Sequence, residues 1–256
     1  MLRRQVPAAL QGLVQDIVHY RETVRGRFRQ VETASLVVPL VIGFGEAFPI
    51  GLGREPSATE TYGSFTSGLY AGPVVIHSTG RMECVQVNFT PLGAWRFFGL
   101  PMSEIASRMV SVDDLPDRSI RDLKLRLTGL PSAALRLDLV TAFVVDRLTR
   151  SEARDAATEA AYRLMHTRNG DIRISAIAER LDWSRKHLAD RFRTTIGVSP
   201  KTLARIMRFN HAQAMARAGG DWADIAAACG YADQAHLARE FHELSGSTPT
   251  AWKAAA

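Results

Sequence analysis

The stretches Leu188–Pro200 (LADRFRTTIGVSP) and Leu237–Pro249 (LAREFHELSGSTP) are two copies of one pattern near the end of the chain. They lie 49 residues apart, with Leu, Ala, Phe, Gly and Pro at matching positions. A short amphipathic segment precedes each copy, ISAIAERL before the first and DIAAACG before the second. Two short helices joined by a tight turn make a helix-turn-helix motif, whose second helix enters the DNA major groove. The repeat therefore predicts two such motifs.

Helix start and stop signals frame the repeats. Side chains that favour N-caps stand where helices should begin, at Ser184, Ser199, Asp221, Asp233 and Thr248. Glycines that favour C-caps stand where helices should stop, at Gly170, Gly197 and Gly246. Pro200 and Pro249 each follow a cap directly, where helices accept proline. The run from Pro200 to about Arg217 is therefore predicted to be one connector helix.

This connector helix sets the reach of the two motifs. At 1.5 Å per residue it would be about 27 Å long. Successive major-groove faces of one duplex lie about 34 Å apart. Two recognition helices at its ends are expected to reach adjacent turns of the same DNA face, which explains why the pattern occurs twice.

The same residues carry a resemblance to a known family. WSRKHLADRFRTTIGVSPKTLARIMRF and DIAAACGYADQAHLAREFHELSGSTPTAW lie within a region, from about Thr158 to Trp252, that resembles the AraC/XylS family of bacterial transcription regulators. GRMECVQVNFTPLGAWRFFGLPMSEIASRMVSVDDL is similar to the N-terminal domain of one AraC-like branch. The resemblance implies an N-terminal sensing or dimerising domain and a C-terminal DNA-binding domain.

Two residues depart from the family pattern. Asp182 stands in the first turn where the family usually has Gly, and Asp tolerates a left-handed backbone better than most residues. Asp190 stands where relatives often carry Arg, which weakens the case for carrying a base contact over to it.

Helical periodicity separates a buried face from a DNA-facing arc in each recognition helix. Leu188 and Phe192 share the buried face of the first helix, and Leu237 and Phe241 that of the second. The DNA-binding candidates are Ser184, Arg185, Lys186, Ala189, Asp190 and Arg193 in the first motif, and Gln234, Ala235, His236 and Arg239 in the second.

Within this set, base contacts are favoured at Arg185, Lys186, Ala189, Gln234, His236 and Arg239. These residues lie toward the N-terminal ends of the helices, which reach bases most easily. Arg can bond guanine and Gln can bond adenine. The competing interpretation for each charge is a solvated helix face or a phosphate contact, because most protein–DNA hydrogen bonds go to phosphate and sugar.

The two motifs differ in charge. Residues 166–217 contain eleven Lys or Arg and four Asp or Glu, whereas residues 218–256 contain two and five. Phosphate attraction supplies most non-specific affinity, so the first motif and the connector are expected to anchor the protein. Asp190 and Arg239 occupy equivalent positions of the repeat, so one outward face presents an acid and the other a base.

The region before the repeats is predicted to be rich in strands over residues 31 to about 92. In MECVQVNF, Val85, Val87 and Phe89 alternate with Cys84, Gln86 and Asn88, as in a half-buried strand. Short apolar runs bounded by Gly, Pro and Ser indicate a small, cupin-like β-barrel or sandwich. Helices are expected from Gly93 onward, in GAWRFFG, PMSEIASRM, DRSIRDLKLRL and ALRLDLVTAFVVDRL.

The predicted fold class is α+β, with this β-rich domain and its flanking helices followed by an all-α domain. The polar stretch TRSEARDAATE suggests the boundary. The predicted divisions are a sensing or dimerising domain at 1–150, a linker at 151–157 and the DNA-binding domain at 158–256.

Two features of the first domain admit alternatives. The helical stripe Leu137, Val140, Val144 and Leu148 either pairs with a second copy of the chain or packs on its own barrel. The aromatic cluster Trp95, Phe97 and Phe98 is expected in the core rather than in a ligand site.

Composition narrows the function classes. The chain has 256 residues, a net charge of +6 and two cysteines without a C-x-x-C pair. Since no paired metal ligands, G-x-S-x-G motif or phosphate loop is visible, no catalytic residue, metal or cofactor is predicted. Polar residues interrupt the basic N-terminus, and no apolar run spans a membrane, so a cytoplasmic, nucleoid-associated protein is expected.

Two hypotheses about the function of the chain stay open. The first is a regulator that binds duplex DNA and is controlled by a small-molecule effector at the N-terminal domain. The second is a ligand-independent dimeric regulator whose N-terminal domain is only structural. A barrel-type enzyme fused to DNA-binding helices is least favoured. Candidate partners are double-stranded DNA, an effector, a second copy of the chain and RNA polymerase.

Overall fold

The structure is a computed structural model that describes residues 1–22, 26, 28–151 and 155–255. The strands of the first half form two antiparallel sheets. One has the order β1-β2-β9-β4-β7-β10 and the other β3-β8-β5-β6. The strands are β1 Leu2–Arg4, β2 Val14–Arg21, β3 Phe28–Glu32, β4 Val38–Gly43, β5 Phe48–Leu52, β6 Thr61–Tyr62, β7 Ser64–Ser67, β8 Val74–Ser78, β9 Glu83–Phe89 and β10 Met109–Ser111.

Strand β9 shows how the alternating sequence builds this sandwich. Val85, Val87 and Phe89 are buried against the helices that cover the six-stranded sheet. The intervening Cys84 and Gln86 face the space between the two sheets. The predicted alternation is therefore confirmed, and it gives the sheet one helix-covered face and one inward face.

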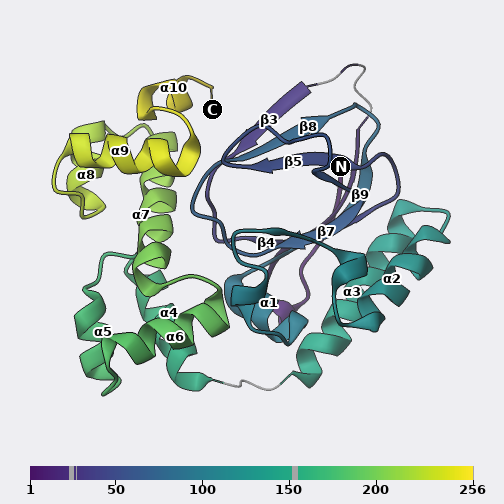
Figure 1. Cartoon of the computed structure of the whole chain (residues 1–256), viewed down its shortest axis with the longest axis horizontal. Coiled ribbons are helices and arrows are strands. Elements are labelled where there is room, and N and C mark those ends of the chain that lie inside the picture. The colour runs from purple at the N-terminus through teal and green to yellow at the C-terminus, as the bar shows by residue number, and fades with distance from the viewer. Residues whose placement is uncertain (23–25, 27, 152–154, 256) are drawn as a thin grey trace.

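Helices and 3₁₀ turns pack on the outer face of the six-stranded sheet (Figure 1). They are η1 Ala8–Leu10, α1 Pro91–Phe98, η2 Met102–Glu104, η3 Val112–Asp114, α2 Arg118–Thr128 and α3 Ala133–Arg150. Trp95, Phe97 and Phe98 of α1 are buried, as predicted. Phe97 and Phe98 pack edge-to-face, with ring centroids 5.1 Å apart.

The apolar stripe of α3 lies inside its own domain. Leu137, Val140, Val144 and Leu148 are all buried, in the core that also holds β2 and α1. Because these side chains have no free surface, the hypothesis that they pair with a second copy is wrong. The alternative, packing on the chain's own barrel, is what the structure shows.

Two other expectations for this half need correction. Strands begin at Leu2 rather than near residue 31. In β2, a register shift between Val14 and Asp16 disturbs the period of two by which a strand is predicted. PMSEIASRM forms only the short η2 turn and then enters β10 at Met109. The amide of Gly68 donates to the carbonyl of Ile105, which holds this segment beside β7 instead of letting it continue as a helix.

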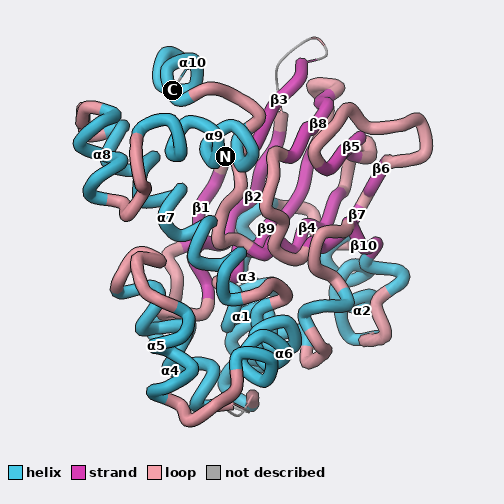
Figure 2. The backbone as a smooth tube through the Cα atoms, turned by 60° about the vertical axis from the view of Figure 1, so that its left-hand side comes forward, coloured by secondary structure: helices cyan, strands magenta, loops and turns pink. Residues whose placement is uncertain are grey.

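The second half is helical throughout the described residues. Its helices are α4 Ala156–Thr167, α5 Ile174–Arg180, α6 Arg185–Ile196, α7 Pro200–Arg217, α8 Trp222–Ala228, α9 Gln234–Ser245 and α10 Pro249–Ala255. Figures 1 and 2 show α7 running between α4–α6 at one end and α8–α10 at the other. The predicted class, a β-rich domain followed by two helix-turn-helix motifs on a connector helix, is confirmed.

The predicted linker falls partly on residues 152–154, which lie outside the described residues. Asp155 caps α4, so the second helical region begins slightly before the predicted residue 158. One continuous core nevertheless joins the two halves, because Phe97 and Val144 share it with Phe192 and Leu203. The guanidinium of Arg96 on α1 also donates to both carboxylate oxygens of the buried Glu159 on α4, at 2.6 and 2.7 Å.

Candidate nucleic-acid interface and the adjoining cavity

The first motif consists of α5, a left-handed turn and α6. Asp182 has φ of +52°, so the aspartate supplies the left-handed residue that the turn needs, as predicted. The hydroxyl of Ser184 accepts a hydrogen bond of 3.1 Å from the amide of His187 and begins α6. Gly197 ends the helix with φ of +96°. Leu188 and Phe192 are fully buried, which fixes the opposite face of α6 toward solvent.

The solvent-facing side of α6 carries most of its predicted DNA contacts. Ser184, Arg185, Lys186, Asp190 and Arg193 are exposed, and Ala189 is half-buried. The guanidinium of Arg193 donates a 3.0 Å hydrogen bond to the carboxylate of Asp190, and both side chains remain more than half exposed. The acid at the centre of this face is therefore partly neutralised by its neighbour one turn away.

The second motif repeats this plan with α8 and α9. Its turn has Gly230 at φ of +70°, and Asp233 accepts a 2.6 Å hydrogen bond from the amide of His236. Leu237 and Phe241 are buried, as predicted. Gln234, Ala235 and Arg239 are exposed on the outward face.

His236 differs from the other candidates because contacts within the motif hold it. Its ring nitrogen Nδ1 accepts a 3.3 Å hydrogen bond from the amide of Ala232. The ring meets Tyr231 edge-on, with centroids 5.4 Å apart. The side chain is half-buried, its Nδ1 is engaged by the turn, and its Nε2 lies 3.9 Å from the carboxylate of Glu240.

An ion-pair cluster ties the connector to the second recognition helix. Glu240 of α9 is buried and accepts hydrogen bonds from Arg205 at 3.0 Å and Arg208 at 3.3 Å, both on α7. Arg205 also pairs with the exposed Glu243. Sequence reasoning missed this cluster because Glu240 lies beside the apolar face of α9, where a carboxylate is unexpected unless it is paired.

These pairs change the charge available for DNA. Arg205 and Arg208 are paired within the molecule, and Arg191 binds Asp155 at 2.6 Å. Within the described residues, other cations of the first motif and connector are exposed and make no ion pair. They are Arg168, Arg173, Arg180, Arg185, Lys186, Lys201 and Arg217, the last of which lies over the Trp252 ring at 4.8 Å. The exposed side chains of the first motif therefore keep a net positive charge. Fewer of its cations are free to contact DNA than the count of Lys and Arg residues suggests.

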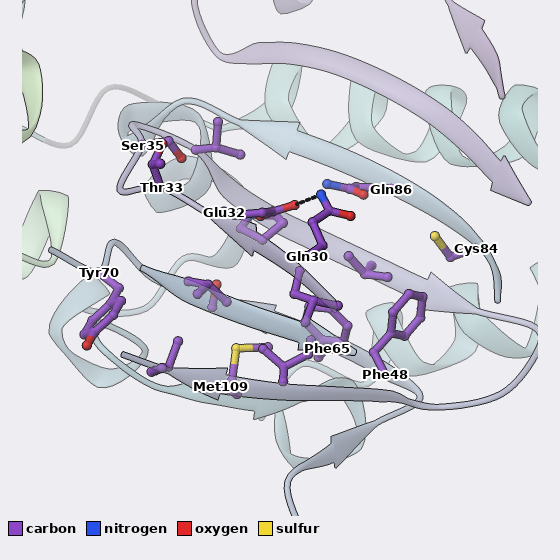
Figure 3. A pocket seen from close by; sticks show the side chains of 18 of the residues that line it. Gln30, Glu32, Thr33, Ser35, Phe48, Phe65, Tyr70, Cys84, Gln86 and Met109 are labelled. Carbon is purple, nitrogen blue, oxygen red and sulfur yellow. Dashed lines mark hydrogen bonds between the residues drawn. The ribbon is translucent and has the colours of Figure 1, made fainter. Parts of the chain in front are cut away.

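The space between the two sheets is a cavity of about 260 Å³. Apolar side chains form part of its walls, among them Phe48 from β5 and Phe65 from β7 (Figure 3). Polar side chains from β3 and β9 also reach it, namely Gln30, Glu32 and Gln86. The sequence gives one signal for these residues, because polar side chains occupy alternate positions of β3 and β9. Only the arrangement of the two sheets shows that they face the same cavity.

Burial and desolvation shift the pKa values of ionisable groups at the cavity. Glu32 lines the cavity and is exposed, and desolvation by the surrounding protein atoms raises the pKa of its carboxyl. Burial likewise raises the pKa of the Cys84 thiol to about 12. The carboxylate of Glu22 accepts hydrogen bonds from Tyr20 at 3.1 Å and from Ser78.

The segment that follows β3 joins this cavity to the DNA-binding helices. Thr33 and Ala34 line the cavity. The amide of Ala34 donates to the carbonyl of Leu244 on α9 at 2.9 Å, and the Ala34 carbonyl accepts from the Asn210 side chain on α7 at 2.8 Å. Gln213 of α7 donates to the Thr33 hydroxyl at 3.1 Å. One short stretch of chain thus touches the cavity, the connector and the second recognition helix.

Metal sites and membrane-spanning helices are absent from the described residues. No group of three or more His, Cys, Asp or Glu side chains is placed to hold a metal ion. No helix in these parts of the chain has the length and apolar character to cross a membrane.

Comparison with known proteins identifies the C-terminal region. Residues 177–255 match the family model of a helix-turn-helix domain. No curated protein sequence matches the chain.

Several solved structures are similar to the chain. ToxT from Vibrio cholerae is 12% identical with a TM-score of 0.48, covering 93% of this chain and 97% of ToxT. ToxT bound to an unsaturated fatty acid is 11% identical with a TM-score of 0.48, covering 98% and 96%. The AraC-like transcriptional activator CuxR is 16% identical with a TM-score of 0.33, covering 79% and 77%. The family-model match shows that residues 177–255 form a helix-turn-helix domain, in agreement with the doubled motif of α5–α6 and α8–α9.

Proposed function

We propose that the chain binds specific DNA sequences by placing α6 and α9 in adjacent major grooves of one duplex. The observation that carries this proposal is the position of two capped recognition helices near opposite ends of the 18-residue helix α7. At 1.5 Å per residue α7 is about 27 Å long, comparable to one turn of DNA. The proposed base-reading residues are Arg185, Lys186 and Ala189 on α6, and Gln234, His236 and Arg239 on α9.

Phosphate contacts are assigned mainly to the first motif in this proposal. Its exposed cations, such as Arg168, Arg173 and Lys201, make no ion pair among the described residues. Each phosphate neutralised by such a side chain contributes about 0.9 to the slope of log affinity against log salt. The second motif has fewer cations, so it contributes specificity more than general attraction.

The finer proposal is that a small molecule in the cavity controls DNA binding. Its support is the segment at Thr33 and Ala34, which lines the cavity and is hydrogen-bonded to α7 and α9. A ligand that moves this segment changes contacts made by the second recognition helix. A ligand-independent regulator is the rival, in which the cavity has no occupant and protein amount alone sets regulation.

The chain acts by binding rather than catalysis in this proposal, in the cytoplasm and on the nucleoid. Self-association and contact with RNA polymerase remain predictions from the family resemblance. Since the α3 stripe is buried, a dimer would have to use another surface.

Two experiments test these statements with the full chain. Selection from random duplexes should enrich a site that spans two successive major grooves, and failure to enrich any site with folded protein contradicts sequence-specific binding. A thermal-shift screen against metabolites tests effector control, because a ligand bound only by the folded state raises the melting temperature. A hit must also change the affinity for the selected site, and a complete lack of such hits favours the ligand-independent rival.

A further inference from the structure

The cavity between the sheets has the size of a small organic molecule. An engineered apolar cavity of about 150 Å³ binds benzene, which has six carbons. By that measure, the 260 Å³ here suits a ligand of about ten non-hydrogen atoms. The apolar walls, with Val41, Phe48, Ile50, Phe65 and Ile76, suit an aromatic or branched aliphatic body.

The polar groups of the cavity decide which head group fits that body. Glu22 already accepts hydrogen bonds from Tyr20, Ser78 and the amide of Met82. Glu32 accepts a single hydrogen bond of 3.4 Å, from the side-chain amide of Gln30 (Figure 3). Among the described residues, no Lys, Arg or His forms an ion pair with Glu32. Its carboxylate is therefore an acceptor with unused capacity at the wall of this cavity.

The charged side chains that line the cavity are two carboxylates and one guanidinium. The lining residues with carboxylates are Glu22 and Glu32, and Arg108 is the cation among the lining residues of the described chain. Arg108 and Glu32 are both exposed, and Glu22 is half-buried. An anionic ligand would place its charge among two carboxylates, whereas a cation would meet an acceptor that the protein leaves under-used.

We propose that the cavity takes a small amphipathic amine, whose apolar body lies between the sheets and whose ammonium group donates to Glu32. The proposal rests on the cavity being the effector site proposed above, and it names the chemical class of that effector. Glu32 immediately precedes the Thr33–Ala34 segment, so an ammonium bound there lies next to the contacts with α7 and α9. Desolvation of Glu32 agrees with this assignment, because a bound cation stabilises the ionised carboxylate that desolvation disfavours.

Three probes with the same phenyl body and different head groups test the proposal. Isothermal titration calorimetry of the full chain compares 2-phenylethylamine, 2-phenylethanol and phenylacetate. The amine should bind about tenfold more tightly than the alcohol, because a hydrogen bond to a charged group is stronger than one between neutral groups. Phenylacetate should bind more weakly than either.

Two matched variants assign the head group to Glu32. Glu32→Gln should bring the affinity for the amine down to that for the alcohol, while the affinity for the alcohol stays within about twofold. Glu104→Gln removes the same charge from an exposed position in η2 and should leave the tenfold ratio unchanged. Circular dichroism and the melting temperature establish that both variants are folded.

Several outcomes overturn the proposal. They are tighter binding of phenylacetate than of the amine, a tenfold ratio that survives Glu32→Gln, and no binding of any probe. The proposed function fails separately. Amine binding through Glu32 with unchanged affinity for the selected DNA site contradicts effector control but supports the ligand class. If phenylacetate binds more tightly than the amine and changes the affinity for DNA, effector control is supported and the amine class is contradicted.

Discussion

The amide of Ala34, in the wall of the cavity, donates a 2.9 Å hydrogen bond to the carbonyl of Leu244 in the second recognition helix. The carbonyl of the same alanine accepts from Asn210 of the connector at 2.8 Å. Ala34 is buried, so these bonds are shielded from water. A displacement of Ala34 therefore changes hydrogen bonds to both α7 and α9, the helices that position the second motif.

Asn210→Ala is expected to loosen this connection. It leaves the buried carbonyl of Ala34 without its donor, which costs about 1–3 kcal/mol locally. Hydrogen exchange followed by mass spectrometry should show faster exchange in the peptide that contains Ala34. Lys201→Ala, at an exposed position of the same helix, is the control and should not change that exchange. Equal exchange in the two variants would show that Asn210 does not hold the segment.

Glu240→Ala is expected to destabilise the chain by about 2 kcal/mol. Removal of this buried carboxylate leaves the guanidinium groups of Arg205 and Arg208, which are only partly exposed, without their buried partner. Glu243→Ala is the matched control, because Glu243 is 63% exposed and its pairing with Arg205 should contribute less than about 1 kcal/mol. Urea unfolding measures both variants, and similar losses of unfolding free energy would argue against the buried cluster.

Arg239→Ala is expected to lose about 1–3 kcal/mol at one base position of the selected site, because a lost bidentate contact to guanine relaxes discrimination there. Binding titrations on the site and on its single-base variants measure this change. A uniform loss over all sequences would mean that Arg239 contacts phosphate instead.

Asp190→Ala gives the opposite expectation at the equivalent position of the first motif. The change removes a carboxylate near the DNA and releases Arg193 from its 3.0 Å hydrogen bond. Non-specific binding should therefore be equal or tighter, since phosphate attraction dominates it. If Asp190 reads a base, preference in that half of the site changes as well. Weaker binding to random duplexes would show that the pair with Arg193 orders the helix face for DNA.

Both cysteines are expected to react slowly with thiol reagents in the folded chain. Burial raises the pKa of Cys84 to about 12 and that of Cys229 to about 11. At pH 8 the thiolate fraction would then be about 10⁻⁴ for Cys84 and about 10⁻³ for Cys229, against roughly a quarter for an ordinary thiol. Labelling with a chromogenic disulfide, with and without denaturant, measures the contrast. Rapid labelling of either residue in the native chain would show that its burial is transient.

The helical half could be predicted in detail because its signals are local. Ser184 and Asp233 accept from the helix amides as their N-cap positions require, and Gly197 and Gly246 take the left-handed conformation at the helix ends. Leu188 and Phe192 are buried at the positions that the helical period gave them. Each of these features depends on residues within one or two turns of the chain.

The features that required the structure depend on contacts between distant segments. Glu32 and Gln86 belong to different sheets, and only strand pairing brings both to the cavity. The bond between Ala34 and Leu244 joins residues separated by most of the chain and uses backbone atoms, which leave no mark in the sequence. The bulge in β2 and the burial of the α3 stripe likewise follow from packing that local periodicity does not encode.

The most direct test of the central claim is guanine N7 protection on the selected duplex, since N7 lies in the major groove. Full-length protein should protect two clusters about one helical turn apart on the same face, and Arg239→Ala should remove protection in only one of them. A single protected cluster, or two clusters on opposite faces of the duplex, would contradict the claim that α6 and α9 read adjacent major grooves.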